Sequence, residues 1–99
     1  MAADDLGRLS DEVSELAFKA FLVAAVKGAL ALQALARELD VALSTATRAA
    51  SELAAFSAAN GPIAVIEESR TGARKRILRL TDAGQALGFA MLRRLAQRA

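Results

Sequence analysis

The stretch LQALARELDVALSTATRAASEL, residues 32–53, decides the fold of this chain. Two apolar stripes with helical spacing follow one another in it: Leu32, Leu35, Ala36 and Leu39, then Ala46, Ala50 and Leu53. Asp40 and Val41 separate the two stripes. Because residues at i, i+3, i+4 and i+7 share one face of a helix, the pattern predicts two short helices joined by a tight turn.

The second predicted helix presents a polar face outward. Its residues outside the apolar stripe are small, hydroxylated or cationic: Ser44, Thr45, Thr47, Arg48 and Ser51. Such side chains suit a surface that lies against phosphates and base edges. An amphipathic helix pair is also ordinary packing, and Arg48 can pair with Glu52 at i+4. The pattern alone therefore favours DNA binding only slightly.

The composition indicates a small globular domain that lacks the commonest catalytic side chains. The 99 residues are 55% hydrophobic and 24% charged, and they include no Cys, His, Tyr or Trp. A disulfide framework and a thiolate metal site are therefore impossible. The commonest general base and metal ligand, histidine, is also missing. We expect no enzyme, no cofactor and no metal, since acid–base chemistry would rest on scattered carboxylates alone.

Charge is distributed unevenly along the chain. Residues 1–69 contain five Lys or Arg against ten Asp or Glu, a balance of −5. Residues 70–99 contain eight Lys or Arg against Asp82 alone, a balance of +7. This asymmetry indicates a basic surface for an anionic partner, with a merely solvated basic helix as the alternative.

No segment is predicted to span a membrane. The most apolar region, residues 20–36, is interrupted by Lys27, and its longest clean run falls far short of the ~20 residues that a span needs. Asp4 and Asp5 stand where a signal peptide carries positive charge. We therefore expect a soluble, cytoplasmic and nucleoid-associated protein.

The predicted domain covers residues 10–99, and residues 1–9 are expected to form a flexible tail. Ser10 is placed to cap a first helix over residues 10–27, because its hydroxyl can accept a hydrogen bond from the first turn. Gly28 is a natural end for that helix.

A last helix over residues 82–98 is expected to begin after the capping residue Thr81. This helix and the one over 10–27 each carry a second apolar stripe. So small a domain offers no internal partner for both extra stripes, and they therefore predict a homodimer built from these two helices. The residues expected at the contact are Phe18, Leu22, Met91 and Leu92.

The segment IAVIEESRTGARKRILRLT, residues 63–81, predicts a β-hairpin, because apolar runs flank a polar centre that contains Gly72. Four cations gather at its tip and on its returning strand: Arg70, Arg74, Lys75 and Arg76. A basic hairpin beside a helix pair favours contact with the DNA backbone or the minor groove. The alternative is a solvated hairpin whose charges serve only solubility.

Two short connections complete the predicted order of elements. Residues 29–31 are expected to form a brief extended segment. The outward helix is expected to continue past Leu53 through Phe56, towards Asn60-Gly61-Pro62, where proline cannot continue a helix.

The predicted elements follow the order helix, short strand, helix, turn, helix, basic hairpin and helix. This is the layout of a winged helix-turn-helix, a mainly α fold with a small β-hairpin. LALQALARELDV (30–41) resembles the first helix of the helix-turn-helix in many bacterial regulators, and STATRAASEL (44–53) resembles the recognition helix. LRLTDAGQAL (78–87) is similar to the strand-to-helix junction of the multiple-antibiotic-resistance regulator (MarR) family. Ala31 and Ala42 depart from the pattern, which often has a capping Ser or Thr there.

The resemblance implies a dimeric regulator of transcription that places two recognition helices in successive major grooves of double-stranded DNA. Ser44, Thr45, Thr47 and Arg48 would then contact the major groove, and the basic hairpin the backbone. A second hypothesis is a winged helix used for protein contact, favoured by the acidic Glu67 and Glu68 in the first hairpin strand. Binding that falls steeply with salt separates the two hypotheses.

Overall fold

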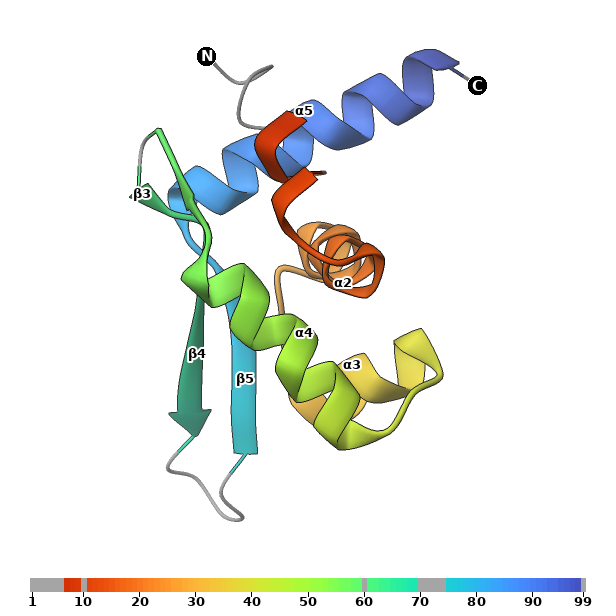
Figure 1. The fold of residues 1–99 in the computed structure, drawn as a ribbon, viewed down its shortest axis with the longest axis vertical. Coiled ribbons are helices and arrows are strands. Elements are labelled where there is room, and N and C mark those ends of the chain that lie inside the picture. Colours follow the sequence, from red (N-terminus) through yellow and green to blue (C-terminus); the bar gives the residue numbers. More distant parts are fainter. Residues whose placement is uncertain (1–6, 10, 60, 70–74, 99) are drawn as a thin grey trace.

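The computed structural model describes residues 7–9, 11–59, 61–69 and 75–98 of the chain. The elements follow in the order α2 (Glu15–Lys27), β1 (Ala29–Ala31), α3 (Leu32–Leu39), α4 (Leu43–Ala55), β2 (Ser57–Ala58), β3 (Gly61–Pro62), β4 (Ala64–Ser69), β5 (Lys75–Leu80) and α5 (Asp82–Arg98). This order confirms the predicted winged helix-turn-helix, with a hairpin of β4 and β5 as the wing (Figure 1).

The wing belongs to a three-stranded antiparallel sheet in the order β1-β5-β4. Leu78 on the central strand lies opposite Leu30 of β1 and Ile66 of β4. The predicted hairpin and the brief extended segment before the helix pair are therefore confirmed. Since side chains alternate along a strand, this register turns Leu78 and Leu80 towards the helices and Arg79 to the other face.

The core lies between the sheet and helices α2, α3 and α4. Its largest fully buried side chains come from every one of these elements: Phe21, Leu35, Leu53, Leu78 and Leu80. Alanine lines the crossings of the helices, where Ala20, Ala24 and Ala46 are fully buried. Small side chains let the helices approach closely, which explains how an alanine-rich chain fills a core with few large residues.

The turn between α3 and α4 rests on Asp40, which adopts the left-handed conformation at φ 56° and ψ 50°. Its backbone N–H donates to the carbonyl of Arg37, and that of Val41 donates to Ala36. Aspartate enters this region more readily than most residues. Ala31 and Ala42 are the N-caps of α3 and α4, and neither makes a side-chain cap hydrogen bond, as the sequence indicates.

The junction between β5 and α5 explains why Thr81 and Gly84 stand within the segment LRLTDAGQAL (78–87). The hydroxyl of Thr81 donates to the carbonyl of Pro62 at 2.6 Å and accepts from the N–H of Gly84 at 3.1 Å. A Cβ at Gly84 would overlap the carbonyl oxygen of Ile63. Threonine therefore caps the helix and fastens it to the preceding loop, and glycine is needed because backbone occupies the space beside it.

The N-terminal part differs from its expectation. Residues 7–9 are helical and Leu9 is fully buried in the core, so this part of the segment is not a flexible tail. Helix α2 begins at Glu15 instead of following a cap at Ser10, which lies outside the described residues. The physical reason is Ser14, whose hydroxyl accepts from the N–H of Ala17 at 3.1 Å and so provides the cap.

The end of the outward helix also differs from its expectation. Helix α4 stops at Ala55, and Phe56 is extended and buried instead of continuing the helix. The guanidinium of Arg8 lies 5.1 Å from the centre of the Phe56 ring. Strand β2 then pairs with β3, which turns the chain towards the wing earlier than the sequence predicts.

Candidate nucleic-acid interface

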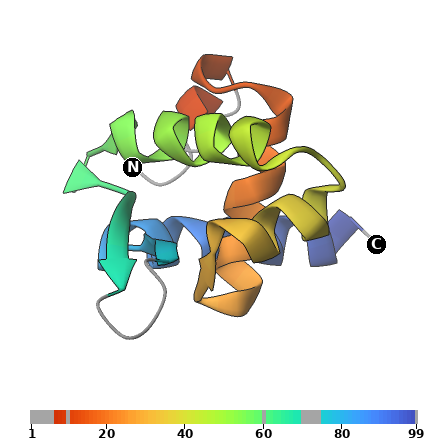
Figure 2. The ribbon, with the colours of Figure 1, turned by 90° about the horizontal axis from the view of Figure 1, so that it is seen from below.

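The outward face of α4 lies opposite its buried alanines. Ser44 and Arg48 are exposed, as the sequence predicts, whereas Thr45 and Thr47 are half-buried at the two sides of the helix. Leu43, at the first position of α4, is 47% exposed. Figure 2, the view from below, looks onto α3, α4 and the hairpin of β4 and β5, with α5 behind them. The outward face of α4 and the wing therefore share one end of the molecule.

Arg48 does not pair with Glu52. Instead, the Glu52 carboxylate accepts hydrogen bonds from the backbone N–H of Ser14 at 2.9 Å and from its hydroxyl at 3.1 Å. These contacts fix the start of α2 against α4. In the part of the chain that the structure describes, Arg48 forms no hydrogen bond or ion pair, so its charge is directed to solvent.

Thr47 uses its hydroxyl proton within the helix. The hydroxyl donates to the carbonyl of Leu43 one turn earlier, at 2.8 Å. A threonine bonded back in this way keeps no free proton for another partner, and offers its methyl group and an oxygen lone pair.

A cavity of about 160 Å³ joins the start of α4 to the start of β5, near the tip of the wing. Its lining comes from four elements, β1, α3, α4 and β5: Ala31, Leu32, Gln33, Leu43, Thr47, Lys75 and Arg76. The floor is therefore mainly apolar, and two cations stand at one side. Leu43 and Thr47 of α4 and the two cations of the wing are therefore brought together at one cavity from distant parts of the sequence.

The described part of the wing carries three cations, all on β5. Lys75 and Arg76 are exposed on neighbouring, opposite-facing positions of β5, whereas Arg70 and Arg74 lie outside the described residues. Arg79 forms an ion pair with Glu67 across the two strands, at 2.6 Å. The outer face at the base of the wing is therefore close to neutral.

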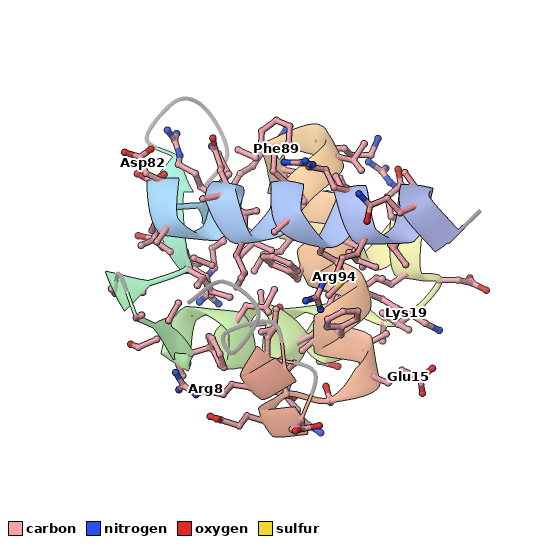
Figure 3. All side chains as sticks on the ribbon, turned by 90° about the horizontal axis from the view of Figure 1, so that it is seen from above. Arg8, Glu15, Lys19, Asp82, Phe89 and Arg94 are labelled. Atoms are coloured by element: carbon pink, nitrogen blue, oxygen red, sulfur yellow. The ribbon has the colours of Figure 1, made fainter. Side chains whose placement is uncertain are left out.

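Apolar side chains are exposed at the other end of the molecule. Phe89 on α5 is 70% exposed and Val26 at the end of α2 is 71% exposed, and both border one hollow together with Leu92. Figure 3 shows Phe89 beside the end of α2, with Arg94 on the opposite side of α5. Neither Phe89 nor Val26 is among the residues that sequence analysis selects for a dimer contact.

The four residues selected from the sequence are only partly accessible. Phe18, Leu22, Met91 and Leu92 are all half-buried, and the first three pack against the core. Their spacing predicts an apolar face but does not separate core from surface. The sequence gives no signal for the exposure of Phe89, because it shares an apolar stripe with Leu92 three residues later.

The described residues hold no group of three or more carboxylate, histidine or cysteine side chains that could bind a metal ion. No helix within the described ranges is long and apolar enough to cross a membrane. The candidate site of the described fold is the surface formed by α4 and the start of β5, where Leu43, Thr47, Lys75 and Arg76 line one cavity.

No protein-family model matches the sequence. A search of the curated proteins finds no match either. Several solved structures are similar to this one. The structure of disulfide-formed AbfR matches it with a TM-score of 0.70 and 19% sequence identity, and the match covers 91% of this chain. RV1404 from Mycobacterium tuberculosis has a TM-score of 0.65 with 16% identity, covering 99% of this chain.

NMB1585, a MarR family regulator from Neisseria meningitidis, has a TM-score of 0.64 with 21% identity and covers 97% of this chain. The chain spans 58%, 68% and 63% of the length of AbfR, RV1404 and NMB1585 respectively. The chain therefore has the winged helix-turn-helix fold that a MarR family regulator also has.

Proposed function

We propose that this protein binds double-stranded DNA as a dimeric regulator of transcription. Helix α4 enters the major groove, and its outward residues Ser44 and Arg48 contact base edges there. Thr45 and Thr47, at the sides of the helix, contact the groove walls. The similar fold of a MarR family regulator supports this assignment.

The observation that carries the proposal is the free guanidinium of Arg48. A surface arginine can pair with a carboxylate four residues further along a helix, which is worth a few tenths of a kcal/mol. Here Glu52 is bonded to Ser14 instead, so the geometry of α2 and α4 leaves Arg48 available for a partner. Arginine donates two parallel hydrogen bonds to guanine O6 and N7, the commonest specific contact in the major groove.

The wing supplies contacts to phosphate in this proposal. Lys75 and Arg76 lie beside the cavity that adjoins α4, so a duplex seated on α4 passes close to both. Arg70 and Arg74, which lie outside the described residues, precede them in the sequence, and their charges are expected to add contacts to phosphate. Arg79 is excluded, since Glu67 already neutralises it. Affinity is plotted as its logarithm against the logarithm of salt concentration. Removal of one phosphate contact should reduce the steepness of that slope by about one.

We propose that a second copy of the chain covers the apolar end. Phe89, Val26 and Leu92 form its centre, and Leu95, 45% exposed on the last turns of α5, extends it. Phe18, Leu22 and Met91 lie on the same two helices and add partly buried surface at its border. Large exposed apolar side chains in one patch are typical of a surface that another protein covers.

Selection of duplexes from a random library, followed by binding titrations with the enriched duplex, tests the proposed function. Selection should enrich a defined sequence, and the logarithm of its affinity should fall linearly with the logarithm of salt concentration. Phe89→Ser should weaken both dimerisation and binding to a two-half-site duplex, whereas Val65→Ser, an exposed apolar position on the sheet, is the matched control. A chain that enriches no sequence and binds duplex equally at all salt concentrations is not a DNA-binding regulator.

A protein-interaction module is the second candidate. The near-neutral outer face at the base of the wing favours it, since Glu67 and Arg79 cancel there and Val65 beside them is 38% exposed. In that case the partner would be a protein that docks on the sheet. Binding to such a partner would survive Arg48→Ala and would be lost with Val65→Asp.

A further inference from the structure

Leu43 stands at the first position of α4, on the surface that the proposed function places in the major groove. It is one of five large hydrophobic side chains exposed within the described residues, and it lies next to Ser44 on the outward face. The leucine side chain is apolar, so its exposure to water is unfavourable. It also cannot donate a hydrogen bond to a base or a phosphate. Its exposure is explained if a partner buries it.

The surroundings of Leu43 are apolar at the floor and basic at the rim. Leu43 and Thr47 line one cavity with Gln33, and the hydroxyl proton of Thr47 is already used inside the helix. Lys75 and Arg76 stand at the side of the same cavity. The fitting occupant is therefore an anionic molecule that offers a small apolar group close to its charges.

Double-stranded DNA offers one such group in the major groove, the 5-methyl of thymine. A·T and T·A pairs differ from G·C pairs there by this methyl, and apolar side chains recognise it by contact. Residues at the start of a recognition helix are the ones that reach base edges. Leu43 occupies that position, and its phosphate-binding neighbours in the proposed function are Lys75 and Arg76.

We infer that Leu43 is a specificity-determining residue that packs on the 5-methyl group of a thymine, with Thr47 beside it. The inference rests on the proposed function and deepens it, since it assigns an A·T pair to one position of the bound sequence. Arg48, one turn further along α4, reads a separate base pair by hydrogen bonds.

Replacement of thymine by deoxyuridine tests the inference, because it removes only the methyl group and keeps base pairing. A duplex selected from a random library is synthesised with each thymine replaced in turn. Wild type should lose about fourfold in affinity at one position per half-site, the effect of leaving one methyl unburied. Leu43→Ala and Leu43→Gln should bind the thymine and deoxyuridine duplexes equally. Val65→Ala, an exposed apolar residue on the sheet, should keep the wild-type difference.

The outcomes separate the inference from the proposed function. Selection of a duplex with salt-dependent binding, but with no effect of deoxyuridine at any position, would overturn the role of Leu43 and leave the regulator intact. An equal loss in wild type and in both Leu43 variants would also overturn it, because another residue then contacts the methyl. Failure to select any sequence would overturn the proposed function, and the inference with it.

Discussion

The two ends of the described fold differ in whether their polar groups are hydrogen-bonded within the protein. At the junction of β5 and α5, Thr81 bonds to both Pro62 and Gly84, and no space remains beside Gly84. At the end formed by α4 and the start of β5, α4 begins without a side-chain cap and Arg48 has no hydrogen-bond or ion-pair partner within the described chain.

This difference separates residues that hold the fold from residues that remain available to a partner. Groups at the junction are paired inside the protein, so their loss leaves donors or acceptors unsatisfied. Groups at the α4 end face water, so their loss has little effect on folding. Substitutions at the junction should therefore lower stability, and substitutions at the other end should leave it unchanged or raise it.

The largest effect is expected for Gly84→Ala. Its methyl group would overlap the backbone oxygen of Ile63, which cannot move without displacing α5 from the sheet. We expect a loss of about 3 kcal/mol or more in the free energy of unfolding, since overpacking against backbone is costly. Thermal unfolding should show a fall in Tm of about 12 °C or more. Gly7→Ala, where nothing lies within 4 Å of the added group, is the control and should change little.

Thr81→Val should have the next largest effect. Valine keeps the shape of threonine but loses the bonds to Pro62 and Gly84. We expect a loss of about 1–2 kcal/mol, measured by urea unfolding. Thr81→Ser keeps the hydroxyl and should remain close to wild type. Equal stability of Thr81→Val and wild type would show that the junction is not held by this hydroxyl.

Ala42→Ser should stabilise the protein, because Ala42 already has the extended backbone of an N-cap, at φ −66° and ψ 153°, without a side chain that can accept. The new hydroxyl can bond to an N–H of the first turn of α4, which is worth about 1 kcal/mol. Ala54→Ser, inside the same helix, lacks this opportunity and serves as the control. An unchanged unfolding midpoint in Ala42→Ser would contradict the claim that the start of α4 has room for a side-chain cap.

The order of elements was predictable because their signals are local. Leu32, Leu35 and Leu39 fix the first helix of the pair by spacing alone, and Asp40 tolerates the left-handed turn that follows. The hairpin was predictable for the same reason, since Ile77, Leu78 and Leu80 carry its pattern. Thr81 was predictable as a cap, but the need for Gly84 became clear only from the oxygen of Ile63 beside it.

The differences from prediction come from contacts between residues far apart in the sequence. Phe56 continues the helical pattern of α4, yet its burial beneath Arg8 ends the helix. Leu9 stands among polar residues, and nothing nearby indicates that it fills the core. Glu52 stands four residues after Arg48, where the two could form an ion pair. Its carboxylate instead accepts a hydrogen bond from the N–H of Ser14, 38 residues away in the sequence.

Arg48→Ala is the most direct test of the claim that the α4 end is kept for DNA. Since Arg48 makes no contact within the described fold, the free energy of unfolding should change by less than about 0.5 kcal/mol. Affinity for the selected duplex should fall by about 1–3 kcal/mol, and the loss should depend on the base pair at one position. Arg94→Ala removes an equal charge from α5 and should cost much less affinity. Unchanged affinity in Arg48→Ala, or an equal loss in both variants, would contradict the account.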